Sequence, residues 1–303
     1  MKKTKVILIM TDTQRKDQVG CYGNKDMKTP NLDRLADGGM RFERAYTTQP
    51  VCGPARSGLF VGTFPHTNGS ISNESPLFSN ARHIGQRLQA ADIRTAYIGK
   101  WHLDASDYFG AGQCPDGWDP DYWYDMRNYL EELTPEERKQ SRKGSTVWDE
   151  ERLFGHRCSD RAIDFLETHQ EDSYFLTVSY DEPHGPGLCP QRFRDMHRDT
   201  VFPKSPNVWD RLEDKPAHQR AWGEGRITKD KDALRIRGNF GCNSYVDYEI
   251  GRVLDTIDQF APDALVIYTS DHGDMVESHS LFSKGPAMYE EITNIPCIVR
   301  WPG

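Results

Sequence analysis

"SYVDYEIGRVLDTIDQFAPDALVIYTSDHGD", residues 244–274, contains a helical pattern, then a strand-like run, then acidic residues and a histidine. The helical part, 244–260, carries apolar residues on one face, as an amphipathic helix does: Val246, Ile250, Val253, Leu254 and Ile257. The run "DALVIYTSD", 263–271, is apolar and bounded by polar residues, which predicts a buried strand. A helix followed at once by a buried strand is the repeating unit of α/β folds.

The same alternation recurs along the rest of the chain. Strand-like runs occupy 5–11, 93–100 and 173–180, and helical patterns occupy 29–39, 83–91 and 160–170. The run "IPCIVR", 295–300, near the end is also apolar, and we expect it to join the main sheet. The sequence therefore predicts an α/β fold with a mostly parallel central sheet and helices on both faces.

Two long stretches, 103–158 and 185–240, interrupt the alternation. Segments of this length inside an α/β domain are usually functional lids or insertions. The first is rich in aromatic residues: Trp118, Tyr122, Trp123 and Tyr124. Such rings either stack on sugar rings or pack the insertion onto the sheet, and we expect packing for most of them.

Composition narrows the class of protein. The chain has 303 residues and a net charge of −8, with no Lys/Arg-rich block, so we expect no nucleic-acid partner. The N-terminal run "VILIM" is shorter than the apolar region of a signal peptide, and no stretch reaches the roughly 20 apolar residues that span a bilayer. Seven scattered cysteines without C-x-x-C spacing favour reduced thiols. We therefore expect a cytoplasmic protein without a membrane partner.

Polar and charged residues follow four of the predicted strands. They are Asp12 after the first strand, Lys100 and His102 after the second, Asp181, Glu182 and His184 after the third, and Asp271 and His272 after the fourth. A lone aspartate at a strand end is usually a turn or capping residue, and a lone histidine is usually structural. Parallel strands bring their carboxyl ends to one edge, where ligands bind in α/β sheets. Four such coincidences predict a functional site at that edge.

The stretch "PVCGPARSG", residues 50–58, places Cys52 at an expected helix start, with Pro54 in the first turn and Arg56 one turn on. A helix N-terminus and an arginine stabilise an anion. The alternative for Cys52 is a buried, inert thiol, which is the commonest fate of a free cysteine. The flanking Gly, Pro and Arg argue against a core segment.

Several motifs resemble one known family. "C-x-P-x-R" followed by "SGLFVGTFPHTNG" resembles the signature of the type I sulfatases, in the alkaline-phosphatase-like superfamily. Further blocks resemble that family in its order: "KVILIMTDTQ", "GCYGN", "TPNLDRLADGGMRFERAY", "GKWHL", "EPHGP", "YTSDHGD" and "SKGPAMYEEITNIPCIVRWPG". The resemblance extends from residue 5 to residue 303, apart from the two insertions.

The resemblance implies a set of catalytic residues. Cys52 corresponds to the cysteine that a separate maturation enzyme converts to Cα-formylglycine, whose hydrate is the nucleophile. His102 corresponds to the histidine that takes a proton when sulfate is released, and Arg56 and Lys100 to residues that hold the formylglycine and the charge near the metal. His184 and Lys284 correspond to groups that bind sulfate and assist the leaving oxygen.

The resemblance also implies one divalent metal ion. Its expected ligands are Asp12, Asp271 and His272, with residue 52 completing the site and Thr13 facing the metal through an oxygen. Many family members have a second aspartate in place of Thr13 and an asparagine in place of His272. The family favours Ca²⁺, with Mg²⁺ as an alternative, whereas an imidazole ligand shifts preference towards Mn²⁺ or Zn²⁺.

The expected function is hydrolysis of a sulfuric ester, a small anionic substrate, with a sulfated carbohydrate as one candidate. Two alternatives remain at this point: a phosphonate monoester or phosphodiester hydrolase, because "SDHGD" also occurs there, and an inactive truncated fragment. Family members usually continue past "RWPG" into further strands and a small C-terminal domain. We expect residues 1–303 to form the catalytic domain, without that C-terminal part.

Overall fold

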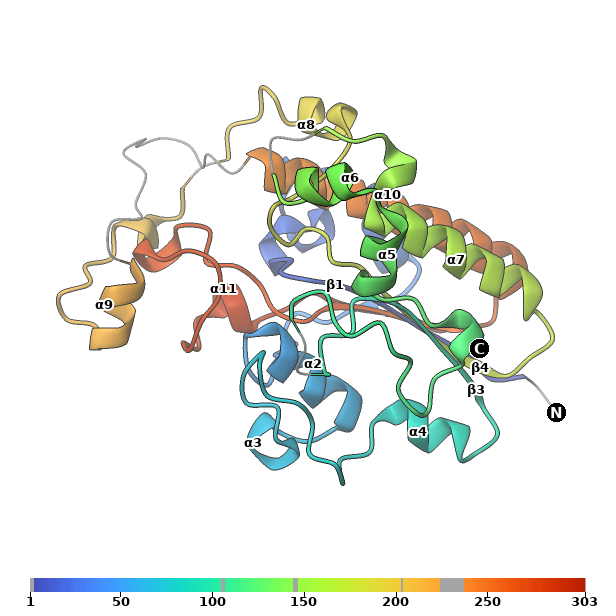
Figure 1. The fold of residues 1–303 in the computed structure, drawn as a ribbon. Helices are drawn as coiled ribbons and strands as arrows, with labels where there is room; N and C mark the ends of the chain where they lie inside the picture. Colours follow the sequence, from blue (N-terminus) through green and yellow to red (C-terminus); the bar gives the residue numbers. More distant parts are fainter. Residues whose placement is uncertain (1–2, 105–106, 144–146, 203, 224–236, 303) are drawn as a thin grey trace.

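The computed structural model describes residues 3–104, 107–143, 147–202, 204–223 and 237–302. Its centre is a six-stranded sheet with the order β2-β6-β5-β1-β4-β3 (Figure 1). The strands are β1 (Lys5–Thr11), β2 (Met40–Arg41), β3 (Arg94–Gly99), β4 (Tyr174–Ser179), β5 (Leu265–Ser270) and β6 (Cys297–Arg300). Every strand expected from the sequence is present, and the two-residue strand β2 adds an edge.

The sheet is mostly parallel, as expected. β1 pairs in parallel with both β4 and β5, and β3 pairs in parallel with β4. β6 runs antiparallel to β5 and to β2, so the antiparallel part is confined to one side. The carboxyl ends of β1, β3, β4 and β5 consequently lie along one edge of the sheet.

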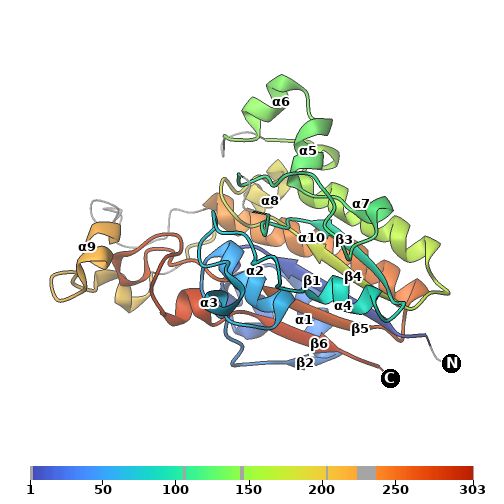
Figure 2. The same ribbon diagram turned by 60° about the horizontal axis from the view of Figure 1, so that its bottom comes forward.

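Helices cover both faces of the sheet (Figures 1 and 2). Long helices α7 and α10 pack with α1 on one face, and α2 and α4 lie on the other. The helices are α1 (Pro30–Asp37), α2 (Cys52–Val61), α3 (Pro65–Asn68), α4 (Ile84–Gln89), α5 (Met126–Glu132), α6 (Pro135–Gln140), α7 (Phe154–Thr168), α8 (Gln191–Met196), α9 (Ala217–Gly223), α10 (Arg237–Phe260) and α11 (Glu290–Thr293). Among the described residues, no helix combines the length and the apolar character that crossing a bilayer requires.

The alternation of side chains along β1 explains the two layers. Ile7 and Ile9 are fully buried against the α7 and α10 side, whereas Leu8 and Met10 belong to the core on the α2 side. Successive side chains of a strand point to opposite faces, and an apolar residue at every position requires cover on both. The continuous apolar run of β1 therefore fixes its place in the middle of the sheet.

The first insertion packs onto the sheet through its aromatic residues, as expected for most of them. Trp118 and Tyr124 are buried, Trp118 among the residues on the α2 side and Tyr124 on the α7 side. Tyr122 lies with its ring edge against Phe165 of α7. The insertion supplies α5 and α6, and the second insertion supplies α8 and α9, while residues 224–236 lie outside the described part of the chain.

His83 gives the fold a testable pH dependence. Its ring stacks on Trp118, with centroids 5.5 Å apart, and burial lowers its pKa to about 4 although Asp116 partly opposes the shift. Because the folded state disfavours the charged imidazole, the unfolded chain binds this proton first. The contribution of His83 to the free energy of unfolding is therefore complete above pH 6.5 and is lost as the pH falls towards 4. Acid lowers the free energy of unfolding of the wild type, and we expect this loss to be about 2 kcal/mol smaller in His83→Phe.

Denaturant unfolding of the wild type and the variant at pH 7.5 and pH 4.5 measures that difference. His66→Phe is the matched control, because His66 is exposed and its ring stacks on that of Phe64, with centroids 5.7 Å apart. Equal acid sensitivity of the wild type and His83→Phe would rule out this role for His83.

Candidate active site

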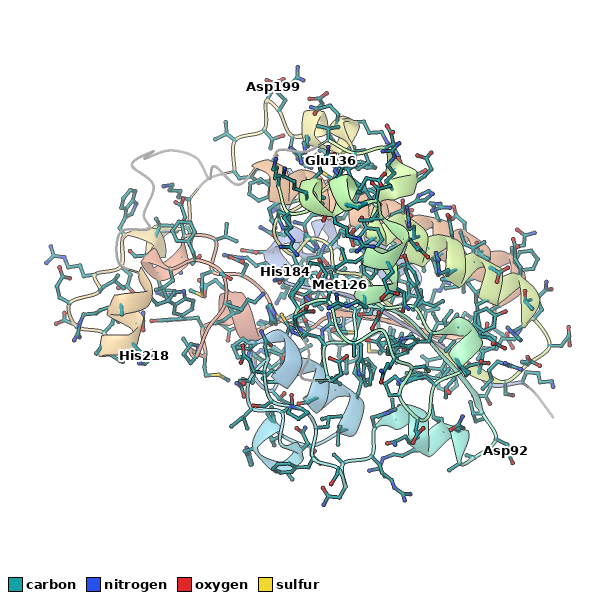
Figure 3. All side chains as sticks on the ribbon, in the orientation of Figure 1. Asp92, Met126, Glu136, His184, Asp199 and His218 are labelled. Carbon is teal, nitrogen blue, oxygen red and sulfur yellow. The ribbon has the colours of Figure 1, made fainter. Side chains whose placement is uncertain are left out.

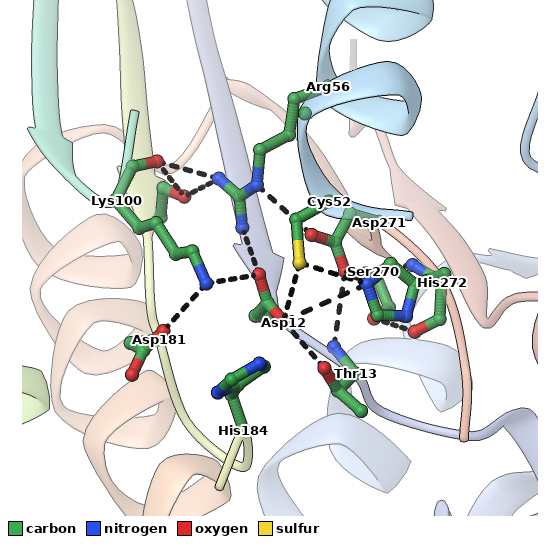
Figure 4. Close-up of polar contacts among 12 residues, drawn as sticks. Asp12, Thr13, Cys52, Arg56, Lys100, Asp181, His184, Ser270, Asp271 and His272 are labelled. Atoms are coloured by element: carbon green, nitrogen blue, oxygen red, sulfur yellow. Dashed lines mark hydrogen bonds and ion pairs between the residues drawn. The ribbon is translucent and has the colours of Figure 1, made fainter. Parts of the chain in front are cut away.

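The functional residues expected at the strand ends come together at the carboxyl edge of the sheet (Figure 4). Asp12 follows β1, Lys100 follows β3, Asp181 lies just beyond β4 and Asp271 follows β5. Cys52 is the first residue of α2 and reaches the same place from the side. Parallel pairing of these strands thus assembles a cluster whose members are up to 259 positions apart in the sequence.

Four side chains in this cluster form a compact donor group. Ligand atoms of Asp12, Cys52, Asp271 and His272 all lie within 4.8 Å of one another, and all four residues are buried. Two carboxylates, an imidazole and a sulfur or its oxygen replacement are suitable donors for a divalent metal ion. Buried carboxylates this close together also repel each other unless positive charge lies between or beside them. These residues therefore fit a metal ion.

Hydrogen bonds orient the donors. The Nδ1–H group of His272 donates to the carbonyl oxygen of Gly273 at 2.8 Å, which directs Nε2 towards the sulfur of Cys52 at 3.2 Å. Thr13, at φ 69°, donates its backbone N–H to Asp271 at 3.1 Å and its hydroxyl to Asp12 at 2.6 Å. Thr13 thus holds both carboxylates in place.

Arg56 lies behind the two carboxylates and is completely buried. Its guanidinium donates to Asp12 and to Asp271, each at 3.0 Å, and to the carbonyl oxygen of Lys100 at 2.6 Å. A planar guanidinium suits two acceptors at fixed angles, which an ammonium group does not. Arg56 therefore fixes the spacing of the two acidic residues as well as compensating their charge.

Lys100 reaches the cluster because of the glycine before it. Gly99 has φ 119°, and a Cβ atom there would lie 1.9 Å from the carbonyl oxygen of Ser179. Only glycine accommodates this turn next to β4. The Lys100 ammonium then contacts Asp12 and Asp181, each at 2.9 Å, and is almost fully buried.

His184 and Lys284 meet on another side of the cluster. The Lys284 ammonium donates to Nε2 of His184 at 2.7 Å, which leaves the proton of the neutral imidazole on Nδ1. That Nδ1 lies 2.8 Å from the Tyr108 hydroxyl and 2.8 Å from the carbonyl oxygen of Gly185. Tyr108 in turn donates to Asp181, so a chain of hydrogen bonds connects Lys284 with Lys100.

His102 completes the set of expected residues. It is buried at φ 58°, and its ring lies 5.7 Å from that of Tyr108. Its Nδ1 has no hydrogen-bond partner among the residues that the structure describes. Burial and the charges of Lys100 and Arg56 lower its pKa to about 4, so the imidazole is neutral at pH 7 and has a lone pair free to accept a proton.

The cations of the cluster favour the anionic forms of Cys52 and Asp12, whereas burial and Asp12 raise the pKa of Asp271 to about 7. Burial and Asp12 raise the pKa of Cys52, but Lys100, His272 and Lys284 outweigh them and lower it to about 6. Burial also raises the pKa of Asp12, yet Lys100 and other cations hold it well below its usual value. Both groups are thus ionised at neutral pH, as metal ligands must be.

The sequence indicates no role for two residues of the cluster. It places Asp181 at the end of a strand, and the structure shows that this carboxylate accepts a hydrogen bond from Lys100 at 2.9 Å. Tyr108 lies in the first insertion, where no periodicity or motif indicates which side chain faces the sheet. All the predicted residues reach the cluster or its border, including Arg56, His102, His184 and Lys284.

Comparison with known proteins bears on this geometry. A family model described as Sulfatase matches residues 4–303. The chain belongs to the sulfatase family. This confirms the family that the sequence motifs resemble.

Relatives in this family are known from several bacteria. The uncharacterized sulfatase YidJ of Escherichia coli (strain K12) is 42% identical over 315 residues, covering 100% of this chain and 63% of that protein. The N-acetylglucosamine-6-O-sulfatase of Bacteroides thetaiotaomicron is 26% identical over 373 residues, covering 99% of this chain and 63% of that protein. The chain thus spans about 63% of the length of these two sulfatases.

Solved structures show that the fold is shared more widely. A protein in complex with its substrate D-glucosamine-2-N,6-O-disulfate has a TM-score of 0.78 and 23% identity, covering 99% of this chain and 72% of that one. The phosphonate monoester hydrolase of Agrobacterium radiobacter has a TM-score of 0.79 and 21% identity, covering 100% and 68%. Both structures therefore share the fold of this chain.

Proposed function

We propose that this chain carries the catalytic domain of a sulfuric ester hydrolase. The reaction is R–O–SO₃⁻ + H₂O → R–OH + HSO₄⁻, in which the bond between sulfur and the ester oxygen breaks and sulfur gains an oxygen from water. The observation that carries the proposal is the buried group of Asp12, Cys52, Asp271 and His272 beside Arg56, Lys100 and Lys284, in a member of the sulfatase family.

Cys52 is the proposed site of the nucleophile. Its conversion to Cα-formylglycine is a two-electron oxidation in which the C–S bond breaks, sulfur leaves as hydrogen sulfide and an aldehyde C=O forms, and a separate maturation enzyme supplies the oxidant. When present, the hydrated aldehyde offers one hydroxyl for attack on sulfur and a second for release of sulfate. His102, neutral at pH 7, accepts the proton in the release step.

The cations of the site bind the sulfate group. Lys100 and Lys284 place ammonium groups near Cys52 and compensate negative charge on the sulfate oxygens, while Arg56 keeps the carboxylates in position. His184 and Lys284, joined at 2.7 Å, provide the hydrogen bond and the proton for the departing ester oxygen. Preorganised cations in a buried site need little rearrangement during the reaction.

A divalent metal ion is the proposed cofactor, held by Asp12, Asp271, His272 and residue 52. When bound, it supplies positive charge against the sulfate oxygens and the nucleophile. Ca²⁺ is the family expectation, but Ca²⁺ takes six to eight oxygen ligands, and an imidazole is a better donor for Mn²⁺ or Zn²⁺. The donor set therefore favours a transition metal.

The proposed substrate is the sulfate ester of a carbohydrate or of another alcohol. One of the two relatives described above is named for N-acetylglucosamine-6-O-sulfate hydrolysis. None of the seven cysteines is paired in a disulfide, which supports a reducing compartment such as the cytoplasm.

A competition between substrates tests the reaction class. We expect matured, metal-loaded protein to hydrolyse 4-nitrophenyl sulfate with a kcat/KM at least about 100-fold above that for 4-nitrophenyl phenylphosphonate. Both substrates are monoanions, but sulfate presents three terminal oxygens to the cations of the site, whereas the phosphonate has a phenyl group in place of one of them. Release of nitrophenol measures both rates. The second candidate, a phosphonate or phosphodiester hydrolase, is favoured by His272 at the metal position, and a reversed ratio would establish it instead.

A further inference from the structure

A cavity of about 380 Å³ lies between the first insertion and the segment after β4. Its walls are mainly apolar and aromatic, with Phe109, Met126, Tyr129, Phe154 and Leu188 among them. Figure 3 shows Met126 and His184, which both line this cavity, in the middle of the molecule. The volume lies within the range of small-molecule pockets, near its lower end.

The cavity begins at the proposed leaving-group residues. Tyr108, Asp181 and His184 line it and also belong to the active-site cluster. His184 contacts Lys284 through Nε2 and Tyr108 through Nδ1, so the imidazole lies between the sulfate-binding cations and the cavity. In an in-line displacement the leaving oxygen departs on the side opposite the nucleophile. If His184 holds the ester oxygen, the organic group attached to that oxygen extends into this cavity, which His184 lines.

The walls differ in character along the cavity. Tyr108 and Phe109 present aromatic rings whose centroids are 5.4 Å apart, and Tyr129 and Phe154 form a second pair at 5.3 Å. Glu182 also lines the cavity, is only 7% exposed, and its Oε2 has no hydrogen-bond partner among the described residues. Aromatic faces with one isolated polar atom suit a ring that has an apolar face and a hydroxyl or similar group at its edge.

We propose that this cavity is the leaving-group pocket and that it accepts a six-membered ring in the alcohol part of the ester. The inference rests on the proposed function, which it extends to the shape of the substrate. Phe109, Tyr129 and Leu188 are the residues that determine this preference. Sugar rings and apolar six-membered rings both present a broad face of C–H groups, which aromatic side chains contact.

Two pairs of substrates test the pocket. Cyclohexylmethyl sulfate and n-heptyl sulfate are both primary alkyl sulfates with equal numbers of carbons, and they differ in whether those carbons form a ring. We expect the ring compound to have a kcat/KM about tenfold higher, because stacking on rigid aromatic walls costs little conformational entropy. Glucose 6-sulfate then shows whether the preferred ring is hydroxylated or apolar.

Variants connect the preference to the cavity. Phe109→Ala removes a partly exposed wall ring, and we expect it to lower kcat/KM for the ring substrate about fivefold and for n-heptyl sulfate less than twofold. Leu188→Phe fills the cavity from the opposite segment and has the same selective effect, so a folding defect in either variant leaves the other as the test. Phe64→Ala is the matched control, because Phe64 is 58% exposed and lies outside the cavity.

A binding measurement separates this inference from the proposed function. Fluorescence anisotropy of 4-methylumbelliferone, a ring-shaped phenol without sulfate, reports occupancy of the pocket even in protein that hydrolyses nothing. If no sulfate ester is hydrolysed, Phe109-dependent binding of the phenol supports the pocket while the proposed function fails, and binding that does not depend on Phe109 overturns both. If esters are hydrolysed, equal rates for the ring and heptyl compounds overturn the pocket and leave the function standing.

Discussion

Cys52→Ala is expected to lower kcat on 4-nitrophenyl sulfate by about 10⁴-fold or more, because the nucleophile itself is removed. Cys52 sits at the first residue of α2, within 3.2 Å of His272 and 3.7 Å of Asp12, so the substitution also removes one donor of the metal group. Turnover of the wild type and the variant, each produced with a maturation enzyme, measures the loss.

The mass of the peptide that contains Cys52 shows whether the loss of turnover in Cys52→Ala reflects the loss of formylglycine. The wild-type peptide containing Cys52 should be about 18 Da lighter than its unmodified mass, since thiol becomes aldehyde. Cys297→Ala is the matched control: this half-buried cysteine lies on β6, away from the cluster, and its loss should change kcat less than twofold. Wild-type activity in Cys52→Ala would exclude Cys52 as the nucleophile.

Metal affinity is expected to fall by at least about 100-fold in Asp12→Asn and in Asp271→Asn. Removing a group that only orients a metal ligand typically lowers metal affinity 10- to 100-fold. A charged side chain that itself binds the metal contributes more to the affinity than such a group does. Isothermal titration with Mn²⁺ measures the dissociation constant, and circular dichroism verifies that each variant folds.

Two nearby aspartates provide the controls for the metal experiment. Asp17 is paired with Arg15 at 2.6 Å and is largely exposed, and Asp274 accepts backbone N–H groups of Val276 and Ser283. Neither belongs to the donor group, so Asp17→Asn and Asp274→Asn should change affinity less than about threefold. Similar losses in all four variants would contradict the ligand assignment.

The positions of the site residues could be predicted because strand direction determines them. β1, β3, β4 and β5 are apolar runs that end at a charged or polar group, and parallel pairing necessarily brings those ends together. The motif around Cys52 also predicts the start of α2, the helix that brings this residue to the cluster from the side. The hydrogen bonds within the cluster, such as that of Arg56 to the Lys100 carbonyl, depend on side-chain geometry that periodicity does not encode.

The first turns of α7 could not be predicted from the sequence, for a specific physical reason. The helical pattern begins at residue 160, whereas the helix begins at Phe154, because Gly155 donates its N–H to the Glu182 carboxylate at 3.0 Å. A cap supplied from a segment 27 positions away leaves no local signal in the sequence. Tyr108 was missed for the same reason: its place depends on contacts with Asp181 and His184 from another strand end.

The position of β1 also has a consequence for how the chain acquires its structure during synthesis. β1 is made first, yet its neighbours β4 and β5 begin at residues 174 and 265. At about 5–20 residues per second, the ribosome needs on the order of ten seconds or longer to deliver both partners. Both edges of this apolar strand are unpaired until β4 has been made, and one edge stays unpaired until β5 follows. Such late, non-local pairing makes folding slow. The arrangement that assembles the active site from distant strand ends thus also leaves the nascent chain with a long interval in which chaperones have an exposed strand to bind.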